Sequence, residues 1–321
     1  MADKITIRKL AAELKMSPAT VYRALSGFPN MRQETRRAVM KEAHRKGYQL
    51  PMHERHNIAV IVPSFSFAGY LECLLPCLEN EFHRRGFRLE LIPEPDIVLL
   101  GNHMFDGIVS LVWKKGLEKM LPQNFAIPIL TINAASNTLE NIPRIISDPK
   151  GIRMALDYLY DRGCRKIFYF GTCTENSPEA TERLEEFRNF CSETGQDFET
   201  LHQTYPHPKL EDEIAVLVKM KADAFFCVSE SLAAQIGHLL KKAGLRIPQD
   251  ISLMGLEDRW SNECFTPPIT AIRQNFEQIA AAAAENIAGK ITAGIPMKGC
   301  RIPFTLIERE SVRSPEDPAS F

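Results

Sequence analysis

The side chains that carry most enzyme chemistry form no recognisable catalytic group in this sequence. The eight histidines lie at positions 44, 53, 56, 83, 103, 202, 207 and 238, with no spacing typical of a metal site. We expect His202 and His207 to be exposed in a proline-containing loop. There is no Walker A loop, nucleophile elbow, His-Glu-x-x-His motif or glycine-rich dinucleotide motif after a strand. These observations predict a binding protein without cofactor or metal, not an enzyme.

Charge divides the chain into two parts. Residues 1–56 contain twelve Lys and Arg against five Asp and Glu, a net charge of +7; the remainder contains 27 basic and 35 acidic residues, a net charge of −8. A basic end on an acidic body suggests that one part meets a polyanion and the other does not. The alternative is a merely solvated basic surface, so the order of the residues must decide.

The composition excludes several classes of protein. A chain of 321 residues, 45% hydrophobic and 25% charged, is long enough for two or three folded domains. No apolar run approaches the roughly 18 residues of a membrane span, and the N-terminus lacks a secretory apolar stretch. The eight cysteines include only one close pair, Cys73 and Cys77, and no Cys-x-x-Cys motif. We therefore expect a cytoplasmic protein with reduced thiols.

The basic end contains the pattern of three short helices. Thr6 is a candidate N-cap for the first helix, and Ser17-Pro18 starts the second with proline at its first position. The third is expected over residues 32–46, with Gly47 as its C-terminal glycine. Two short helices joined by a tight turn and backed by a third describe a helix-turn-helix unit. A generic three-helix bundle is the alternative.

The residues of this end resemble the DNA-binding headpiece of the lactose-repressor (LacI/GalR) family. The match covers about 48 residues and is densest over residues 6–11, 16–27, 34–36 and 47–48. The resemblance implies that the second helix enters the major groove, with Pro18, Ala19 and Arg23 at the base-reading positions. Of these, only arginine makes a bidentate contact to guanine. Candidates for phosphate contacts are Thr6, Ser17, Thr20, Tyr22 and Arg32. An exposed helix charge is the alternative for Arg23.

The linker after the headpiece departs from the family pattern. Relatives usually carry a short hinge helix that places a leucine in the minor groove. Here residues 49–57 are short and polar, and Pro51 interrupts them. Leu50 or Met52 is the alternative wedge, but we expect a shortened linker.

The rest of the chain alternates strands with helices. Apolar runs predict strands over residues 58–62, 88–92, 107–111, 128–132, 144–146, 166–170, 224–228 and 251–255, with helices near 70–85 and 151–162 among them. This order favours parallel sheets with ligand sites at the carboxyl ends of the strands. It also resembles the family's effector domain, an α/β type I periplasmic-binding-protein-like fold with two parallel-sheet subdomains. One departure lies at 94–105, where a β-α unit is shortened.

The resemblance implies the following division of the chain. The all-α helix-turn-helix headpiece covers residues 1–48, the linker 49–57, the effector-binding and dimerisation domain 58–311, and a loose tail 312–321. Within the effector domain, the N-subdomain is expected over about 58–146 and 274–302, and the C-subdomain over about 147–273 and 303–311.

The family's effector contacts map onto residues of different chemistry. They fall on Phe67, Tyr70, Asn133, Glu179, Arg183, Ser229 and Glu257. Polar groups beside aromatic rings suit a polyhydroxylated ligand in the cleft between the subdomains. Trp113 and Trp260 follow strands and are candidates for stacking on a sugar ring, with buried packing as the alternative. The alternative for Arg183 is a helical ion pair with Glu179 or Glu186. At positions 133, 229 and 257 the family more often has Asp, Asn and Asp, which disfavours the ordinary hexoses.

The sequence thus predicts a DNA-binding transcriptional regulator, expected to be a repressor. Its partners are expected to be double-stranded operator DNA, a sugar or sugar-derivative effector, and a second copy in a homodimer that matches a near-palindromic site. Two alternatives remain: an effector-independent regulator of the same family, and a sugar-binding module or enzyme with no role on DNA.

Overall fold

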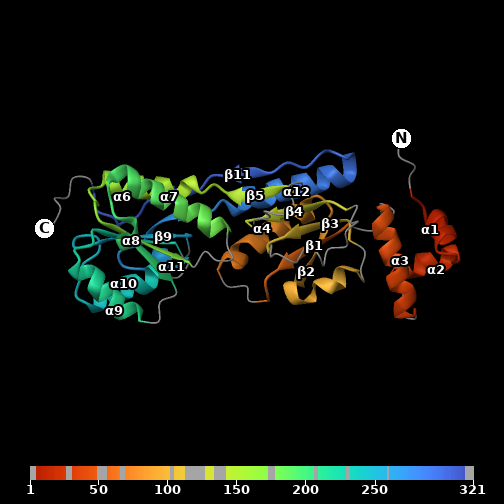
Figure 1. Cartoon of the computed structure of the whole chain (residues 1–321), viewed down its shortest axis with the longest axis horizontal. Helices are drawn as coiled ribbons and strands as arrows, with labels where there is room; N and C mark the ends of the chain where they lie inside the picture. Colours follow the sequence, from red (N-terminus) through yellow and green to blue (C-terminus); the bar gives the residue numbers. More distant parts are fainter. Residues whose placement is uncertain are drawn as a thin grey trace. The chain divides into compact units, whose positions relative to one another are not determined.

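The computed structural model of the chain consists of a helical N-terminal end followed by two α/β parts (Figure 1). It describes residues 5–26, 31–48, 56–65, 69–101, 105–112, 127–133, 142–172, 178–205, 209–228, 232–258 and 260–314. By their internal contacts the residues divide into two compact units. The first comprises Met1–Ile146 and Phe276–Cys300, and the second comprises Ser147–Asn275 and Arg301–Phe321.

The N-terminal helices begin and end where local chemistry places them. They are α1 (Ile7–Glu13), α2 (Pro18–Leu25) and α3 (Gln33–Lys46). The Thr6 hydroxyl accepts a hydrogen bond from the Lys9 amide, and Ser17 Oγ accepts one from the Thr20 amide at 3.0 Å. Gly47 ends α3 at φ 64°, in the left-handed region that favours glycine. The caps expected from the sequence are therefore formed.

A small apolar core holds these helices together. Leu10 of α1, Val21 and Ala24 of α2, and Val39 and Ala43 of α3 are all buried. The opposite side of α2 faces solvent. His44 lies on the buried side of α3, with 2% of its surface exposed.

Burial of His44 makes the stability of the helical end depend on pH. Desolvation lowers its pKa to about 4, from 6.5 in an unfolded chain. Between pH 6.5 and pH 4 the unfolded form therefore binds a proton at His44 that the folded form does not bind. The free energy of unfolding is highest above pH 6.5 and falls as the pH drops towards 4. At pH 5 we expect unfolding of α1–α3 to cost about 2 kcal/mol less than at pH 7.5. Hydrogen exchange of their amides, corrected for intrinsic rates, measures this difference.

The control for this prediction removes the buried imidazole. His44→Leu is expected to abolish the pH dependence between pH 7.5 and 5, whereas alanine at His83, which is exposed on α4 (Tyr70–Arg84), leaves it intact. An unchanged pH dependence in the leucine variant would contradict the assignment.

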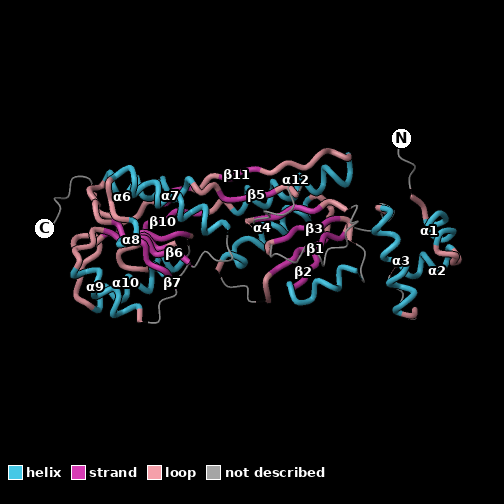
Figure 2. The backbone as a smooth tube through the Cα atoms, viewed as in Figure 1, coloured by secondary structure: helices cyan, strands magenta, loops and turns pink. Residues whose placement is uncertain are grey.

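The first unit is built on a six-stranded sheet with the order β11-β5-β4-β3-β1-β2. Its strands are β1 (Asn57–Val62), β2 (Arg88–Pro93), β3 (Gly107–Ser110), β4 (Ile129–Ile132), β5 (Arg144–Ser147) and β11 (Cys300–Ile302). β1 pairs in parallel with β2 and β3, with Ile58 opposite both Leu89 and Gly107. Because β1 has a neighbouring strand on each side, five of its six residues are buried. The sheet is magenta in Figure 2.

Within the described residues, two long helices and one short one accompany this sheet. α4 packs against α12 (Phe276–Ala293), where the Tyr70 and Phe276 rings meet edge to face at 5.6 Å. The alanines of α12 at positions 280, 283 and 284 are fully buried, as close packing on a sheet requires. In the segment that the sequence marks as shortened, a 3₁₀ helix, η1 (Glu94–Gly101), buries Ile97 and Leu100 in the core.

The second unit has another six-stranded sheet, with the order β12-β10-β9-β8-β6-β7. Its strands are β6 (Ile167–Thr172), β7 (His202–Tyr205), β8 (Ala224–Cys227), β9 (Ser252–Leu256), β10 (Thr270–Arg273) and β12 (Thr305–Ile307). Only the β10–β12 pair is antiparallel among the pairings described. Its helices are α6 (Lys150–Asp161), α7 (Pro178–Thr194), α8 (Phe198–Leu201), α9 (Leu210–Lys219), α10 (Leu232–Lys242) and α11 (Trp260–Cys264).

Two expectations for this unit were wrong. His202 does not lie in an exposed loop: it begins β7 and stacks on the Phe198 ring at 5.4 Å. The packed body also continues beyond residue 311, because Val312 and Arg313 are buried and the Arg313 amide donates to Ser252 Oγ. His207 lies outside the described residues.

Candidate functional site

The exposed face of α2 carries the residues expected to meet DNA. Pro18, Ala19, Tyr22 and Arg23 are exposed, while Val21, Ala24 and Leu25 are buried. The Tyr22 side chain is 49% exposed although it is large and apolar. Within the described part of the chain, the Arg23 guanidinium has no hydrogen-bond or ion-pair partner, so all its donors are available. Such a face suits the floor of a major groove.

The expected phosphate contacts surround this face. Thr6, Ser17 and Arg32 are exposed, and Thr20 is half-buried. The hydroxyls of Ser17 and Thr20 lie 2.8 Å apart, and Ser17 also caps α2. The helix N-terminus adds a positive dipole end at this place, which favours an anionic phosphate. Linker residues 49–55, including Leu50 and Met52, lie outside the described residues.

In the first unit, two of the expected effector residues contact each other. Asn133 follows β4, and its Nδ2 donates to the Tyr70 hydroxyl at the start of α4 at 2.9 Å. Asn133 has φ 47°, an uncommon conformation for a residue with a side chain. Strained backbone of this kind gathers at binding sites. Phe67 and Trp113 are not among the described residues.

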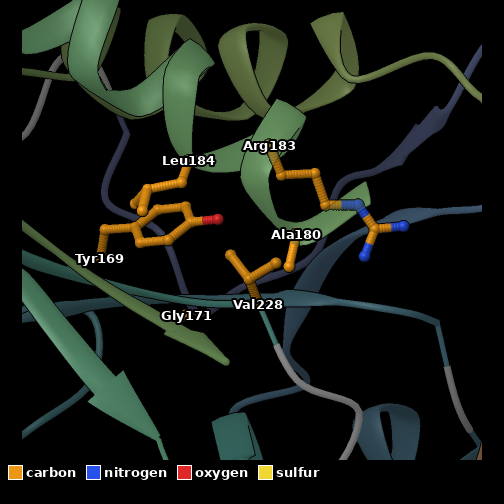
Figure 3. Close-up of a pocket in the computed structure, with 6 residues that line it drawn as sticks. All are labelled: Tyr169, Gly171, Ala180, Arg183, Leu184 and Val228. Carbon is orange, nitrogen blue, oxygen red and sulfur yellow. The ribbon is translucent and has the colours of Figure 1, made fainter. Parts of the chain in front are cut away.

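In the second unit, Arg183 borders a pocket at the carboxyl ends of the strands. Figure 3 shows that the pocket is lined by Tyr169, Gly171, Ala180, Arg183, Leu184 and Val228. These residues come from β6, α7 and the end of β8, which are neighbours in the sheet and helix layers. The pocket combines apolar side chains with the Tyr169 hydroxyl and has one guanidinium at its border. Its volume of about 10 Å³ holds about one water molecule.

Contacts with aromatic rings behind the pocket hold Arg183 and Tyr169 in place. The Arg183 guanidinium lies 5.8 Å from the Phe304 ring centre, and Phe304 itself packs on Gly151. A Cβ at Gly151 would lie 2.3 Å from that ring, so only glycine permits this contact. Tyr169 stacks on Phe187 at 4.7 Å, and burial raises the pKa of its hydroxyl, which stays neutral.

The remaining expected effector residues have different surroundings. Glu257 follows β9 and is 2% exposed, with Gln274 Nε2 donating to its Oε1 at 2.7 Å. Trp260, the first residue of α11, is 73% exposed, so it does not have the buried packing considered as its alternative. Ser229 and the Glu179 side chain lie outside the described part, and the ion-pair alternative for Arg183 stays open.

Sequence reasoning missed most of the pocket lining. Tyr169 and Val228 belong to apolar strand ends, and Ala180 and Leu184 to an ordinary helix pattern. Nothing in these patterns separates a pocket wall from a core contact. The positions of Arg183 and residue 229 in the family pattern were the only signals pointing to this place.

Comparisons with known proteins agree with this architecture. The periplasmic binding protein-like domain family matches residues 156–312. The sucrose operon repressor of Streptococcus mutans is 25% identical, and the match covers 97% of this chain and all of that protein. The structure of the transcriptional regulator CelR in complex with cellobiose has a TM-score of 0.70 and 22% identity, covering 96% of this chain and all of that one. The chain therefore contains a periplasmic binding protein-like domain and is similar over nearly its whole length to transcriptional regulators.

A further structure matches headpiece and effector domain together. The lac repressor dimer bound to its operator and the anti-inducer ONPF has a TM-score of 0.71 and 16% identity, covering 97% of this chain and all of that one. The fold of this chain is therefore the predicted one: a helix-turn-helix headpiece joined to a periplasmic-binding-protein-like domain.

Other kinds of site find no support in the described ranges. No three His, Cys, Asp or Glu side chains there gather as a metal ion would require. None of the helices in those ranges combines the length and apolar character needed to cross a bilayer.

Proposed function

We propose that this chain is a member of the LacI/GalR family and a sequence-specific transcriptional repressor, whose affinity for operator DNA is controlled by a sugar or sugar derivative. The DNA-binding part rests on the exposed face of α2, where the Arg23 guanidinium has no partner among the described residues. The relatives are named as regulators and repressors, so no enzymatic activity is proposed for the chain.

We propose that the protein acts as a homodimer. One recognition helix reads only a few base pairs, whereas two copies related by a twofold axis read two half-sites. The lac repressor structure, a dimer on its operator, supports this proposal. Selection of bound duplexes from random DNA is expected to return a near-palindromic site. Recovery of sequences without internal symmetry would contradict the dimer.

The effector is proposed to bind at the carboxyl ends of the strands. In the second unit the Arg183 guanidinium supplies hydrogen-bond donors, and the Tyr169 and Phe304 rings lie near it. Cellobiose in the CelR structure supports a sugar as the ligand class. Coupling of about 1–3 kcal/mol would change operator affinity by about 5- to 150-fold.

A thermal-shift screen tests the effector. The purified chain is heated with sugars, sugar acids, sugar phosphates and nucleobases, each at high concentration. A ligand present at 100 times its Kd stabilises the native state by about 2.7 kcal/mol, which raises Tm by about 5–10 °C for a unit of this size. At least one sugar-related compound is expected to do so.

The same two experiments separate the alternatives. Operator selection that succeeds while every compound leaves Tm unchanged would favour an effector-independent regulator. A thermal shift with a sugar, but no selected DNA, would favour a sugar-binding module. The proposed function requires both results.

A further inference from the structure

A buried chain of hydrogen bonds begins at Glu257. Gln274 Nε2 donates to Glu257 Oε1 at 2.7 Å, and the Ser147 hydroxyl donates to Gln274 Oε1 at 2.5 Å. Asn262 Nδ2 in turn donates to the Glu257 carbonyl at 2.9 Å. The four side chains are at most 3% exposed. All four residues count with the second unit by their contacts, although Ser147 also ends β5 of the first sheet. Satisfied networks of this kind fix the conformation of the groups that they join.

The network lies where the chain crosses between the units. Ser147 is the first residue after one crossover, and Gln274 stands two residues before the next, at Phe276. The third crossover is adjacent, because the Asp148 amide donates to the Ile302 carbonyl at 2.8 Å. The Glu257 carboxylate is thus connected through two hydrogen bonds to two crossovers, and through Asp148 to the third.

The backbone of Glu257 is itself held in an unusual conformation. Its φ is 74°, which residues with side chains rarely adopt. Its amide donates to the Ile272 carbonyl at 2.8 Å, while its carbonyl accepts from Asn262. Backbone and carboxylate are therefore both engaged by neighbouring residues of the same unit. A conformation of this kind persists only where the surroundings over-determine it.

We infer that Glu257 is a positioning residue that fixes the crossovers. Its carboxylate holds Gln274, whose carbonyl oxygen holds Ser147. A regulatory role of this network rests on the proposed function: a ligand that binds beside β9 changes operator affinity through the network.

Hydrogen exchange on the full chain tests the inference without DNA or sugar. Two amides report on the network: Asp148, bonded to Ile302, and Glu257, bonded to Ile272. Glu257→Ala removes the carboxylate that accepts the hydrogen bond from Gln274 Nε2, which corresponds to about a fivefold to hundredfold change in a local opening equilibrium. We expect exchange at both amides to be at least about tenfold faster than in the unaltered protein.

Two further variants separate positioning from general damage. Glu257→Gln keeps an oxygen that can accept from Gln274, so we expect exchange within about twofold of the unaltered rate. Glu263→Ala is the matched control, because Glu263 is a 69% exposed carboxylate on α11 outside the network. Unchanged exchange in Glu257→Ala, or equally fast exchange in Glu257→Gln, would overturn the inference.

A third variant covers the case in which Glu257→Ala does not fold. Ser147→Ala removes only one hydroxyl from the far end of the chain of hydrogen bonds. We expect exchange at Asp148 to rise about fivefold, with amides of α9 unchanged. Equal rates at Asp148 in this variant and the unaltered chain would contradict the network. Failure of operator selection or of the sugar screen would leave these exchange rates unaffected, so the two proposals fail separately.

Discussion

Replacing Arg23 with alanine is expected to lower the affinity of the proposed dimer for its selected operator by about 100-fold. A bidentate contact between arginine and guanine is worth about 1–3 kcal/mol, and a dimer makes it in both half-sites. Arg23 is exposed on α2, beside residues whose side chains offer no comparable fork of donors. Fluorescence anisotropy with the selected duplex and with a scrambled duplex measures the loss.

The matched control distinguishes base reading from charge. Arg8 is exposed on α1 and carries the same charge, so Arg8→Ala removes one cation without touching the recognition helix. We expect it to weaken both duplexes by similar small factors, whereas Arg23→Ala weakens the selected duplex far more. Arg23→Lys keeps the charge but loses the planar fork, and should resemble the alanine variant. Equal losses on both duplexes for Arg23→Ala would make Arg23 a phosphate contact.

The headpiece was predictable because its signals are local. Thr6, Ser17, Pro18 and Gly47 act on helix ends within three or four residues of themselves, so their roles are written in the neighbouring sequence. The buried runs of the central strands are equally local, and β1 differs from the expected strand by one residue. These elements depend little on what lies elsewhere in the chain.

The less predictable features depend on distant residues. β7 reads His-Gln-Thr-Tyr, a polar edge strand that gains its form from pairing with β6. Glu257 looks like a ligand residue after a strand, but Gln274, 17 positions later, engages its carboxylate. Tyr169 becomes a pocket wall only because Arg183 and Val228 leave space beside it. The sequence marks the place of the site, while tertiary packing decides which side chains remain free to bind.

Replacing Arg183 with alanine is expected to weaken binding of the sugar found in the thermal screen by about 100-fold. A hydrogen bond to a charged group contributes about 1.5–3 kcal/mol, and the guanidinium can make two to vicinal hydroxyls. The other lining residues that the structure describes are apolar or neutral, so none of them replaces this group. At the ligand concentration that raises Tm in the unaltered chain, the variant should show almost no shift.

The same variant tests whether effector and DNA binding are separable. Arg183 belongs to the second unit and α2 to the headpiece, so operator affinity without sugar is expected to be unchanged in Arg183→Ala. The control is Arg188→Ala: this arginine lies on the same helix, α7, but stacks on the Phe198 ring at 3.9 Å, away from the pocket lining. It should retain the sugar-induced shift. If instead Arg183→Ala binds sugar normally while its melting temperature alone falls, Arg183 serves the helical ion pair with Glu179 or Glu186, and the effector must be held by other residues.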